Sequence, residues 1–507
     1  MKTIEELYQK YTQHLRKMQD VNNALALLHW DNEVNAPQKG ASLRGQQIAT
    51  LAGLAHEYAI DSNFGDMLLE LHQQQEHLDE KQTANILLSL EQYKKATKLP
   101  TSFIRNFASA KANAYQAWIA ARKANNFDLY KDALNIIIEL LHQKVSYLGY
   151  QDHPYNALLD EYERGATVQQ LDKLFKHVRQ ELVPFVRTIQ EKGRISPSHF
   201  LQQHFDKEKQ WQFGLDLLEQ MGFDFEAGRQ DISEHPFTIA LSPKDVRVTT
   251  RIDVKNPMDM IGSCIHEGGH ALYEMGLPEE QYGLPLGLAT SLGIHESQSR
   301  LWENHVGLSR AYWQANFERF KGYFPEAMRE IELEDFYKAI NQVAPSFIRT
   351  TADELHYHLH VLVRYEIEKG LMENTFKVDN LEEIWNQKYQ LYLGVEVPTP
   401  NQGILQDIHW AEGLFGYFPT YSLGSFYAAQ FYAQVQKDVP LLEQQIGRGN
   451  CQPLLHWLRE NIHQYGQQYT SEELCQKATG EGLELSYFMD YVQEKYKEIY
   501  QVGSLAI

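Results

Sequence analysis

Helical periodicity constrains the fold of this chain more than any other feature. From Thr3 to about residue 200, apolar side chains recur every three or four positions, which places them on one face of a helix. One such stripe consists of Leu7, Tyr11, Leu15 and Met18. Turn-forming residues interrupt the pattern at 36–37, 99–100, 149–154 and 193–197. The sequence therefore predicts a mainly α-helical fold built from successive amphipathic helices.

A single stretch departs from this pattern. Residues 237–254 read FTIALSPKDVRVTTRIDV, with Thr, Val and Ile in near-alternation and a turn at 242–245. Such residues favour strands, so we predict a β-hairpin or small sheet here. Because an extended peptide can pair with the edge of a sheet, this segment is also a candidate substrate surface.

The composition limits the classes of function. The chain is globular, since 43% of its residues are hydrophobic, and its formal net charge of −20 disfavours nucleic acid and anionic membranes as partners. Cys264, Cys451 and Cys475 are too scattered for a disulfide framework or a CxxC zinc site, and they fit a reducing compartment. Residues 1–20 lack the apolar core of a secretion signal, and no stretch approaches the roughly 18 apolar residues of a membrane span. We therefore expect a cytoplasmic protein.

The motif HEGGH at residues 266–270 predicts a metal site. His266 and His270 are four residues apart, so on a helix both imidazoles can face one ion. Asn256, Pro257 and Gly276 fit the N-cap, the first position and the end of such a helix.

Gly268 and Gly269 lie inside this predicted helix, where each costs about 1 kcal/mol relative to Ala. We interpret them as clearance for a ligand or a neighbouring strand close to the helix backbone. The alternative is an HExxH pattern that arose by chance, and two unfavourable glycines weaken that alternative.

A catalytic zinc site needs a third protein ligand and one open position. Glu296, in the segment HESQSRLWEN, is our candidate, because a second helix crossing the first can present it from the side. Arg300, four residues later, would hold this carboxylate; the alternative is an ordinary surface ion pair between the two. Glu274 reaches back to the ion poorly, and His295 would point roughly 100° away around the helix, where packing or substrate contact suits it better.

Glu267 lies next to a predicted ligand and has no evident structural partner in the sequence. A carboxylate at this position can accept a proton from water that the ion activates. The residues thus predict hydrolysis of peptide bonds without a covalent intermediate, with one divalent ion per chain and Zn²⁺ as the favoured ion.

Several further motifs resemble those of the M32 metallocarboxypeptidases. They follow in order along the chain: WDNEVNAP at 30–37, HPF at 235–237, DVRVT at 245–249, HEGGHALYEMGLP at 266–278, HESQSRLWEN at 295–304, IRTTAD at 348–353 and GILQDIHW at 403–410. The resemblance covers nearly the whole chain. It implies a large helical zincin-like (gluzincin) fold with a deep substrate groove, release of single amino acids from peptide C-termini with broad specificity, a Zn²⁺ or Co²⁺ ion, and a homodimer.

With this resemblance, we expect residues 1–507 to form one catalytic unit with three sub-regions. Residues 1–230 would form an N-terminal helical wall, and 231–310 would hold the small sheet and the metal-binding helices. Residues 311–507 would form a C-terminal helical wall. Its Gly- and aromatic-rich segment 395–424 is expected to be a long irregular loop at the groove.

A carboxypeptidase must bind the free carboxylate of its substrate, which suits the bidentate geometry of arginine. Arg349 resembles the carboxylate-binding arginine of the family; the alternative is an ion pair with Asp353, four residues later. Arg247 is a second candidate, although an arginine on a strand face is often simply solvated. His235 would either contact substrate or end a loop.

The oxyanion formed during hydrolysis needs a hydrogen-bond donor besides the metal. Tyr421 and His409 are candidates, mostly on the resemblance, and structural roles are their alternative. Of His356, His358 and His360, the first and last share a helical face and could mimic a second metal pair. Because no carboxylate lies between them to act as a base, we favour a packed, hydrogen-bonded face.

Two other functions stay open at this point. A metal-dependent oligopeptidase would also use a groove walled by long helices, but it would cleave inside short peptides. A helical binding or scaffold protein would carry an incidental HExxH. The favoured interpretation is a metallocarboxypeptidase whose partners are peptides with a free C-terminal carboxylate, without nucleic acid or membrane partners.

Overall fold

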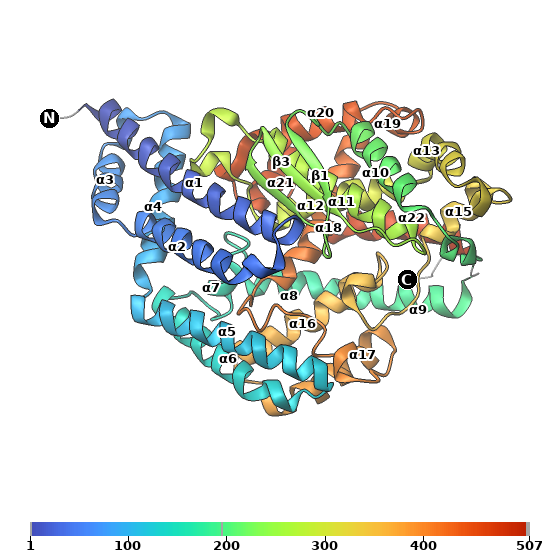
Figure 1. The fold of residues 1–507 in the computed structure, drawn as a ribbon, viewed down its shortest axis with the longest axis horizontal. Helices are drawn as coiled ribbons and strands as arrows, with labels where there is room; N and C mark the ends of the chain where they lie inside the picture. The colour runs from blue at the N-terminus through green and yellow to red at the C-terminus, as the bar shows by residue number, and fades with distance from the viewer. Residues whose placement is uncertain (1–2, 194–195, 503–507) are drawn as a thin grey trace.

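The computed structural model describes residues 3–193 and 196–502, and helices make up most of it (Figure 1). The helices before the sheet are α1 (Ile4–Val34), η1 (Gln38–Gly40), α2 (Ala41–Ala59), α3 (Ser62–Gln73), η2 (Gln75–His77), α4 (Glu80–Lys98), α5 (Thr101–Ala124), α6 (Asp128–Leu148), α7 (Asn156–Leu159), α8 (Val168–His177), η3 (Val178–Leu182), α9 (Val183–Lys192), η4 (His199–Gln202) and α10 (Lys207–Met221). The four predicted turns follow the ends of α1, α4, α6 and α9, although residues 194–195 of the last turn lie outside the described part. The predicted series of helices is thus confirmed.

Three short strands form one sheet with the order β1-β3-β2. Strand β2 (Thr238–Ser242) and strand β3 (Asp245–Thr250) are antiparallel and confirm the predicted hairpin with its turn at 242–245. Strand β1 (Gly228–Ile232) pairs with β3 in parallel and was not predicted. Its sequence GRQDI is polar and does not alternate, so only the pairing with a distant segment makes it a strand.

The chain is helical again after the sheet. These helices are α11 (Pro257–Gly276), η5 (Glu279–Gln281), η6 (Pro285–Gly287), α12 (Leu292–Arg300), η7 (Leu301–Gly307), α13 (Arg310–Tyr323), α14 (Pro325–Met328), α15 (Leu333–Ile340), η8 (Arg349–Thr351), α16 (His356–Met372), η9 (Val378–Asn380), α17 (Leu381–Leu393), η10 (Pro400–Gln402), α18 (Phe418–Asp438), α19 (Leu442–Ile446), α20 (Gln452–Asn461), η11 (His463–Gln468), α21 (Ser471–Thr479) and α22 (Leu485–Tyr500). The prediction of an irregular loop through residue 424 is wrong after residue 417. Pro419 suits the first turn of α18, where its missing N–H is not needed.

The sheet lies directly against α11. Val246 and Val248 of β3 are buried together with Ala271 of α11 and Leu218 of α10 in one small apolar cluster. This burial removes the sheet face from water and holds edge strand β2 beside the middle of α11.

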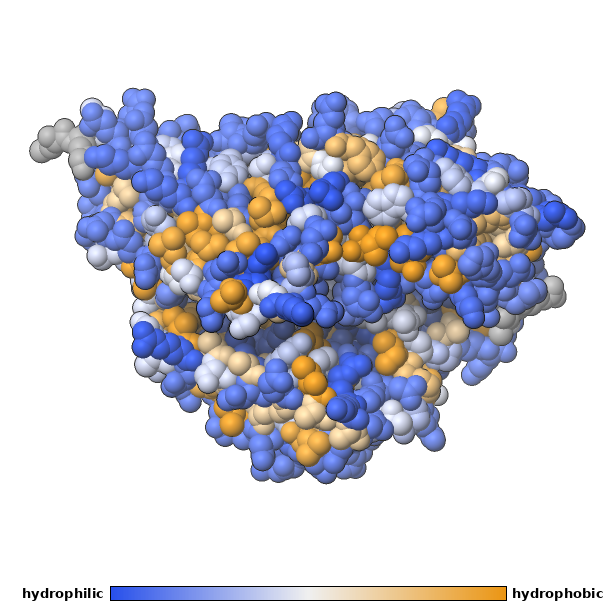
Figure 2. Space-filling model, viewed as in Figure 1, coloured by the Kyte–Doolittle hydropathy of each residue, from blue (hydrophilic) through white to orange (hydrophobic). Residues whose placement is uncertain are grey.

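Two parts of the molecule face each other across a hollow. In Figure 1, α5 and α6 lie along the lower edge with α16 and α17, whereas the sheet, α11 and α12 lie above them. Figure 2 shows this face hollowed between the two parts, in agreement with the predicted groove. No helix in residues 3–193 and 196–502 is long and apolar enough to cross a membrane.

Candidate metal centre

Helix α11 presents both histidines of the HEGGH motif on one face. Pro257 occupies its first turn and Gly276 its last position, as predicted. Asn256 is the N-cap residue, but its side chain makes no capping hydrogen bond, so only its predicted position is confirmed.

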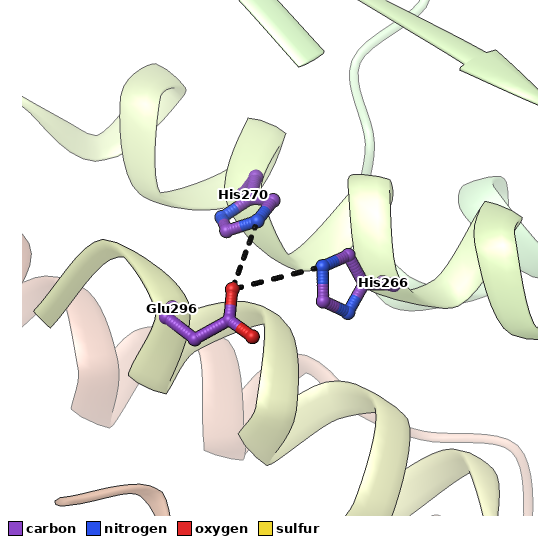
Figure 3. Close-up of side chains that lie close together, drawn as sticks. All are labelled: His266, His270 and Glu296. Atoms are coloured by element: carbon purple, nitrogen blue, oxygen red, sulfur yellow. Dashed lines mark ion pairs between the residues drawn. The ribbon is translucent and has the colours of Figure 1, made fainter. Parts of the chain in front are cut away.

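Glu296 from α12 points between the two imidazoles (Figure 3). Its Oε2 lies 3.8 Å from Nε2 of His266 and 3.6 Å from Nε2 of His270. Tetrahedral coordination with bonds of 2.0–2.2 Å would separate ligand atoms by about 3.3–3.6 Å. These three residues form the one group of such side chains, among the described residues, that could hold a metal ion. Their ligand atoms all lie within 4.8 Å of one another, somewhat wider than the ideal tetrahedral spacing but close enough for the group to hold a single cation.

The other imidazole nitrogens are already engaged. Nδ1 of His266 lies 2.8 Å from a carboxylate oxygen of Glu303, and Nδ1 of His270 lies 3.0 Å from the carbonyl oxygen of His295. These contacts fix the ring orientations and leave both Nε2 atoms facing Glu296. Burial lowers the pKa of His266, yet Glu296 and Glu303 together raise it to about 9, so the surroundings favour positive charge here.

Arg300 holds the carboxylates on the α12 side. Its Nε donates to Glu296 Oε1 at 2.8 Å, and its Nη1 donates to Glu303 Oε2 at 3.0 Å. The predicted Glu296–Arg300 pair thus forms, but the alternative of a surface pair is wrong, because Glu296 is buried. Since one oxygen of Glu296 is bound to Arg300, the carboxylate presents Oε2 toward the histidines.

Small residues let α12 approach its neighbours closely. A Cβ on Gly269 would lie 2.7 Å from Ser299 Cα and 2.8 Å from the Gln298 carbonyl oxygen, and a Cβ on Gly424 of α18 would lie 2.5 Å from both Glu296 Cβ and Cγ. A Cβ on Gly268 would instead meet side chains of α10. The two glycines therefore provide the predicted clearance beside the helix backbone. This clearance accommodates neighbouring helices and not a ligand or a strand.

Glu267 is buried beside the cluster and receives a bond from the sheet. The Thr238 hydroxyl of edge strand β2 lies 2.6 Å from Glu267 Oε2 and 3.0 Å from the Glu267 carbonyl oxygen. Burial raises the pKa of Glu267, while His266 and Thr238 lower it less. A carboxyl group held in a fixed orientation beside the cluster suits proton transfer.

Arg349 is buried in a cluster of alternating charge. It donates to Asp407 Oδ1 from Nη2 at 2.9 Å and from Nε at 3.1 Å, and Arg364 donates to Asp407 Oδ2 at 2.6 Å. Burial raises the pKa of Asp407, but the two guanidinium groups outweigh it and hold the pKa well below its usual range. The alternative pair of Arg349 with Asp353 does not form, because Asp353 binds His356 Nδ1 at 2.6 Å.

His409 and Tyr421 lie together beside Arg349. His409 Nε2 is 3.3 Å from the Tyr421 hydroxyl, and the Arg349 guanidinium carbon is 4.8 Å from the Tyr421 ring centre. Burial lowers the pKa of His409 to about 4, so this imidazole is neutral at pH 7. Tyr421 comes from helix α18 and not from the predicted loop, and Tyr417 at its start lies 5.3 Å away, centre to centre.

His235 and Arg247 stand apart from these clusters. His235 is exposed in the connection between β1 and β2. Arg247 makes two hydrogen bonds to Asp245 and lies 4.5 Å over the Trp30 ring, so it is neither free nor simply solvated. Within the described residues, neither side chain forms an ion pair with the metal cluster.

The three histidines of α16 are buried and hydrogen-bonded. Nδ1 of His356, His358 and His360 contacts Asp353, Ser422 and Tyr389, respectively. These contacts and the burial of all three side chains confirm the predicted packed, hydrogen-bonded face.

Several site residues were missed from the sequence: Thr238, Glu303, Tyr357, Arg364 and Tyr417. Glu303 had a usable signal, because it stands three residues after Arg300 and seven after Glu296, which is one helical face. Thr238, Tyr357 and Arg364 act through contacts with segments distant in sequence, for which the local pattern carries no signal.

The comparisons with known proteins agree with this geometry. Residues 10–496 match the family model described as carboxypeptidase Taq (M32) metallopeptidase. The chain is 38% identical to carboxypeptidase 1 of Bacillus subtilis (strain 168), over 96% of this chain and 97% of that protein. It superposes on a solved structure of a protein called CHT with a TM-score of 0.95 and 55% identity, over 97% and 99% of the two chains. The M32 carboxypeptidase of Deinococcus radiodurans R1 gives a TM-score of 0.96 and 37% identity, over 98% and 100%.

The family match spans far more than half of the chain, and the similar solved structures share its helical zincin-like fold. The chain therefore belongs to the M32 family of metallocarboxypeptidases.

Proposed function

We propose that His266, His270 and Glu296 hold the divalent ion of this metallocarboxypeptidase, with Zn²⁺ ahead of Co²⁺, and that Glu267 is the general base. One observation carries this proposal. Both Nδ1 atoms are engaged, whereas both Nε2 atoms face Glu296 Oε2 at 3.6 and 3.8 Å. Two imidazoles and one carboxylate are a donor set that suits Zn²⁺.

When bound, such an ion lowers the pKa of water and polarises the scissile carbonyl. Glu267 then accepts the proton from the attacking water. Its Oε2 is bound by Thr238, so Oε1 is the oxygen free to take the proton and return it to the departing amine. Tyr421 and His409 are the proposed donors to the oxyanion, because they lie together at the Arg349 side of the site.

Arg349 is the proposed receptor for the substrate carboxylate. Three of its five N–H groups are used in the described contacts, two by Asp407 and one by Tyr357. One N–H group remains on Nη1 and one on Nη2. These two neighbouring N–H groups can bind the two oxygens of a second carboxylate. Asp407 between Arg349 and Arg364 leaves this group of three with one net positive charge, which a substrate carboxylate would neutralise. His235 and Arg247 are proposed to contact substrate farther along the groove.

We further propose that residues 1–507 act as one catalytic unit. The regions 1–230 and 311–507 would wall the groove, 231–310 would carry the catalytic centre, and the part of 395–424 before α18 would line the groove. The resemblance supports a homodimer, and the acidic, cysteine-poor composition supports a cytoplasmic setting. Sedimentation of the purified protein would test the dimer.

The exopeptidase assignment is tested with matched peptides that differ only in C-terminal amidation. Free-acid peptides should lose single residues in order, and amidated ones should be cleaved at least a hundredfold more slowly, since Arg349 then lacks an anionic partner. Equal rates would favour the oligopeptidase. Arg349→Gln should abolish the preference for the free acid.

Metal content separates the enzyme from a scaffold. The purified protein should contain about one equivalent of ion per chain, and His270→Ala should lose it. A protein without bound metal, whose melting temperature does not respond to a chelator, would contradict the metal proposal. Activity restored with Zn²⁺ or Co²⁺ after chelation would identify the competent ions.

A further inference from the structure

Tyr357 lies between the metal centre and the proposed carboxylate receptor. Its hydroxyl accepts a hydrogen bond from Arg349 Nη1 at 3.2 Å. The guanidinium carbon of Arg300 lies 4.3 Å from the centre of the same ring. One side chain therefore contacts an arginine of each cluster.

The metal-side contact belongs to a rigid network. Arg300 donates to Glu296 and Glu303, and Glu303 holds the His266 ring. Arginine over an aromatic ring gains cation–π energy when both are desolvated, and Tyr357 is only 6% exposed. Displacing the ring would thus disturb the contacts that orient Glu296.

The second end of Tyr357 is equally constrained. The Tyr421 ring packs against it edge-on at 6.0 Å, centre to centre, and Arg349 is fixed from its other side by Asp407. The phenol ring and its hydroxyl are therefore held in contact with both Arg300 and Arg349.

We propose that Tyr357 is a positioning residue that sets the distance between the metal centre and Arg349, and so confines cleavage to the last peptide bond. This inference rests on the proposed role of Arg349. The scissile carbonyl and the terminal carboxylate are separated by a single residue, and each added residue lengthens an extended chain by roughly 3.3–3.6 Å. If Arg349 could move away from the metal centre, the penultimate peptide bond could reach that centre. The enzyme would then release dipeptides.

Tyr357→Phe tests this spacing, because it keeps the ring over Arg300 and removes the bond to Arg349. For N-blocked peptides with a free C-terminus, KM should rise about tenfold, the effect of losing one hydrogen bond to a charged group, with kcat changed far less. Mass analysis of a peptide ladder should show dipeptides among the products. Bound metal should stay at the wild-type level.

Tyr365→Phe is the matched control on the same helix. It also removes the hydroxyl of a buried tyrosine, whose contacts, 2.7 Å to Asp172 and 3.4 Å to the Val168 carbonyl oxygen, lie outside the catalytic clusters. This variant should keep the wild-type KM and release only single residues. If it matches Tyr357→Phe in both readouts, general loosening of α16 is the cause and the positioning role of Tyr357 is refuted.

Arg349→Gln separates the two proposals. If this variant still prefers free-acid over amidated peptides, the role of Arg349 fails and the positioning role of Tyr357 fails with it. The other outcome is that Arg349→Gln loses this preference, whereas Tyr357→Phe keeps the wild-type KM and releases only single residues. The proposed role of Arg349 would then be supported, and only the inference on Tyr357 would be overturned.

Discussion

Gly424→Ala is expected to damage the metal centre without unfolding the protein. The added methyl carbon would lie 2.5 Å from Glu296 Cβ and Cγ and 3.0 Å from the Glu296 carbonyl carbon. Ordinary carbon contacts are about 3.5–4.0 Å, so α12 and α18 must separate by roughly 1 Å or more. A change of rotamer cannot relieve the clash, because the Glu296 backbone is part of it.

The expected free-energy changes differ for stability and activity. Overpacking costs about 1–3 kcal/mol, and replacing Gly by Ala in a helix returns about 1 kcal/mol, so the free energy of unfolding should fall by at most roughly 2 kcal/mol. A displacement of roughly 1 Å at a catalytic group costs on the order of a hundredfold in rate. We therefore expect kcat/KM and metal affinity to fall much more than stability.

The assay compares Gly424→Ala with Gly262→Ala on the metal helix. A Cβ on Gly262 would meet nothing within 4 Å, so that variant should be fully active and about 1 kcal/mol more stable. The measurements are kcat/KM, competition for the ion by a chelator, and unfolding in denaturant. Wild-type activity and metal affinity in Gly424→Ala would refute the close packing of α18 on Glu296.

Two other changes probe groups around the centre, and a third probes Glu368 of α16, which is buried and accepts hydrogen bonds from Tyr155, Trp410 and the Gly416 N–H. Glu303→Gln should weaken ion binding about 10–100-fold by loosening the His266 ring, as measured by chelator competition. Thr238→Val should lower kcat roughly tenfold or more at unchanged metal content, because Glu267 loses its hydroxyl donor; an unchanged kcat would contradict this. Burial raises the pKa of Glu368 to about 7 from an unfolded value near 4.5, so its contribution to stability is full below pH 4.5 and is lost as pH rises to about 7. Glu368→Gln should remove about 3 kcal/mol of this pH dependence, read from unfolding free energies at pH 4.5 and 8.

Much of the candidate metal centre could be predicted, because the sequence patterns that indicate it involve residues only a few positions apart. The spacing of His266 and His270 follows from the pitch of one helix, and the Glu296–Arg300 pair follows from the same period on the next. The turns between the N-terminal helices could also be predicted, because proline fixes φ and glycine permits turn conformations at their own positions. Each of these inferences needs only residues a few positions apart.

The predictions that were wrong depend instead on contacts between residues far apart in the sequence. The loop predicted through 424 is helical from Phe418, since Gly424 serves close packing against α12 and not chain flexibility. Strand β1 forms because β3 pairs with it, and Arg349 binds Asp407 and not the nearby Asp353. None of these partners is close in sequence, so no periodicity could identify them.

The sequence by itself indicated the helical class and the candidate metal ligands His266, His270 and Glu296, because helix pitch and side-chain chemistry are properties of short segments, and the resemblance of its motifs indicated the family. Only the tertiary structure decided which groups orient that chemistry. The bond from Thr238 to Glu267, the support of His266 by Glu303 and the place of Tyr357 between two arginines each join segments that meet only after folding. The physical reason is that burial makes such contacts strong, and burial depends on how the whole chain packs.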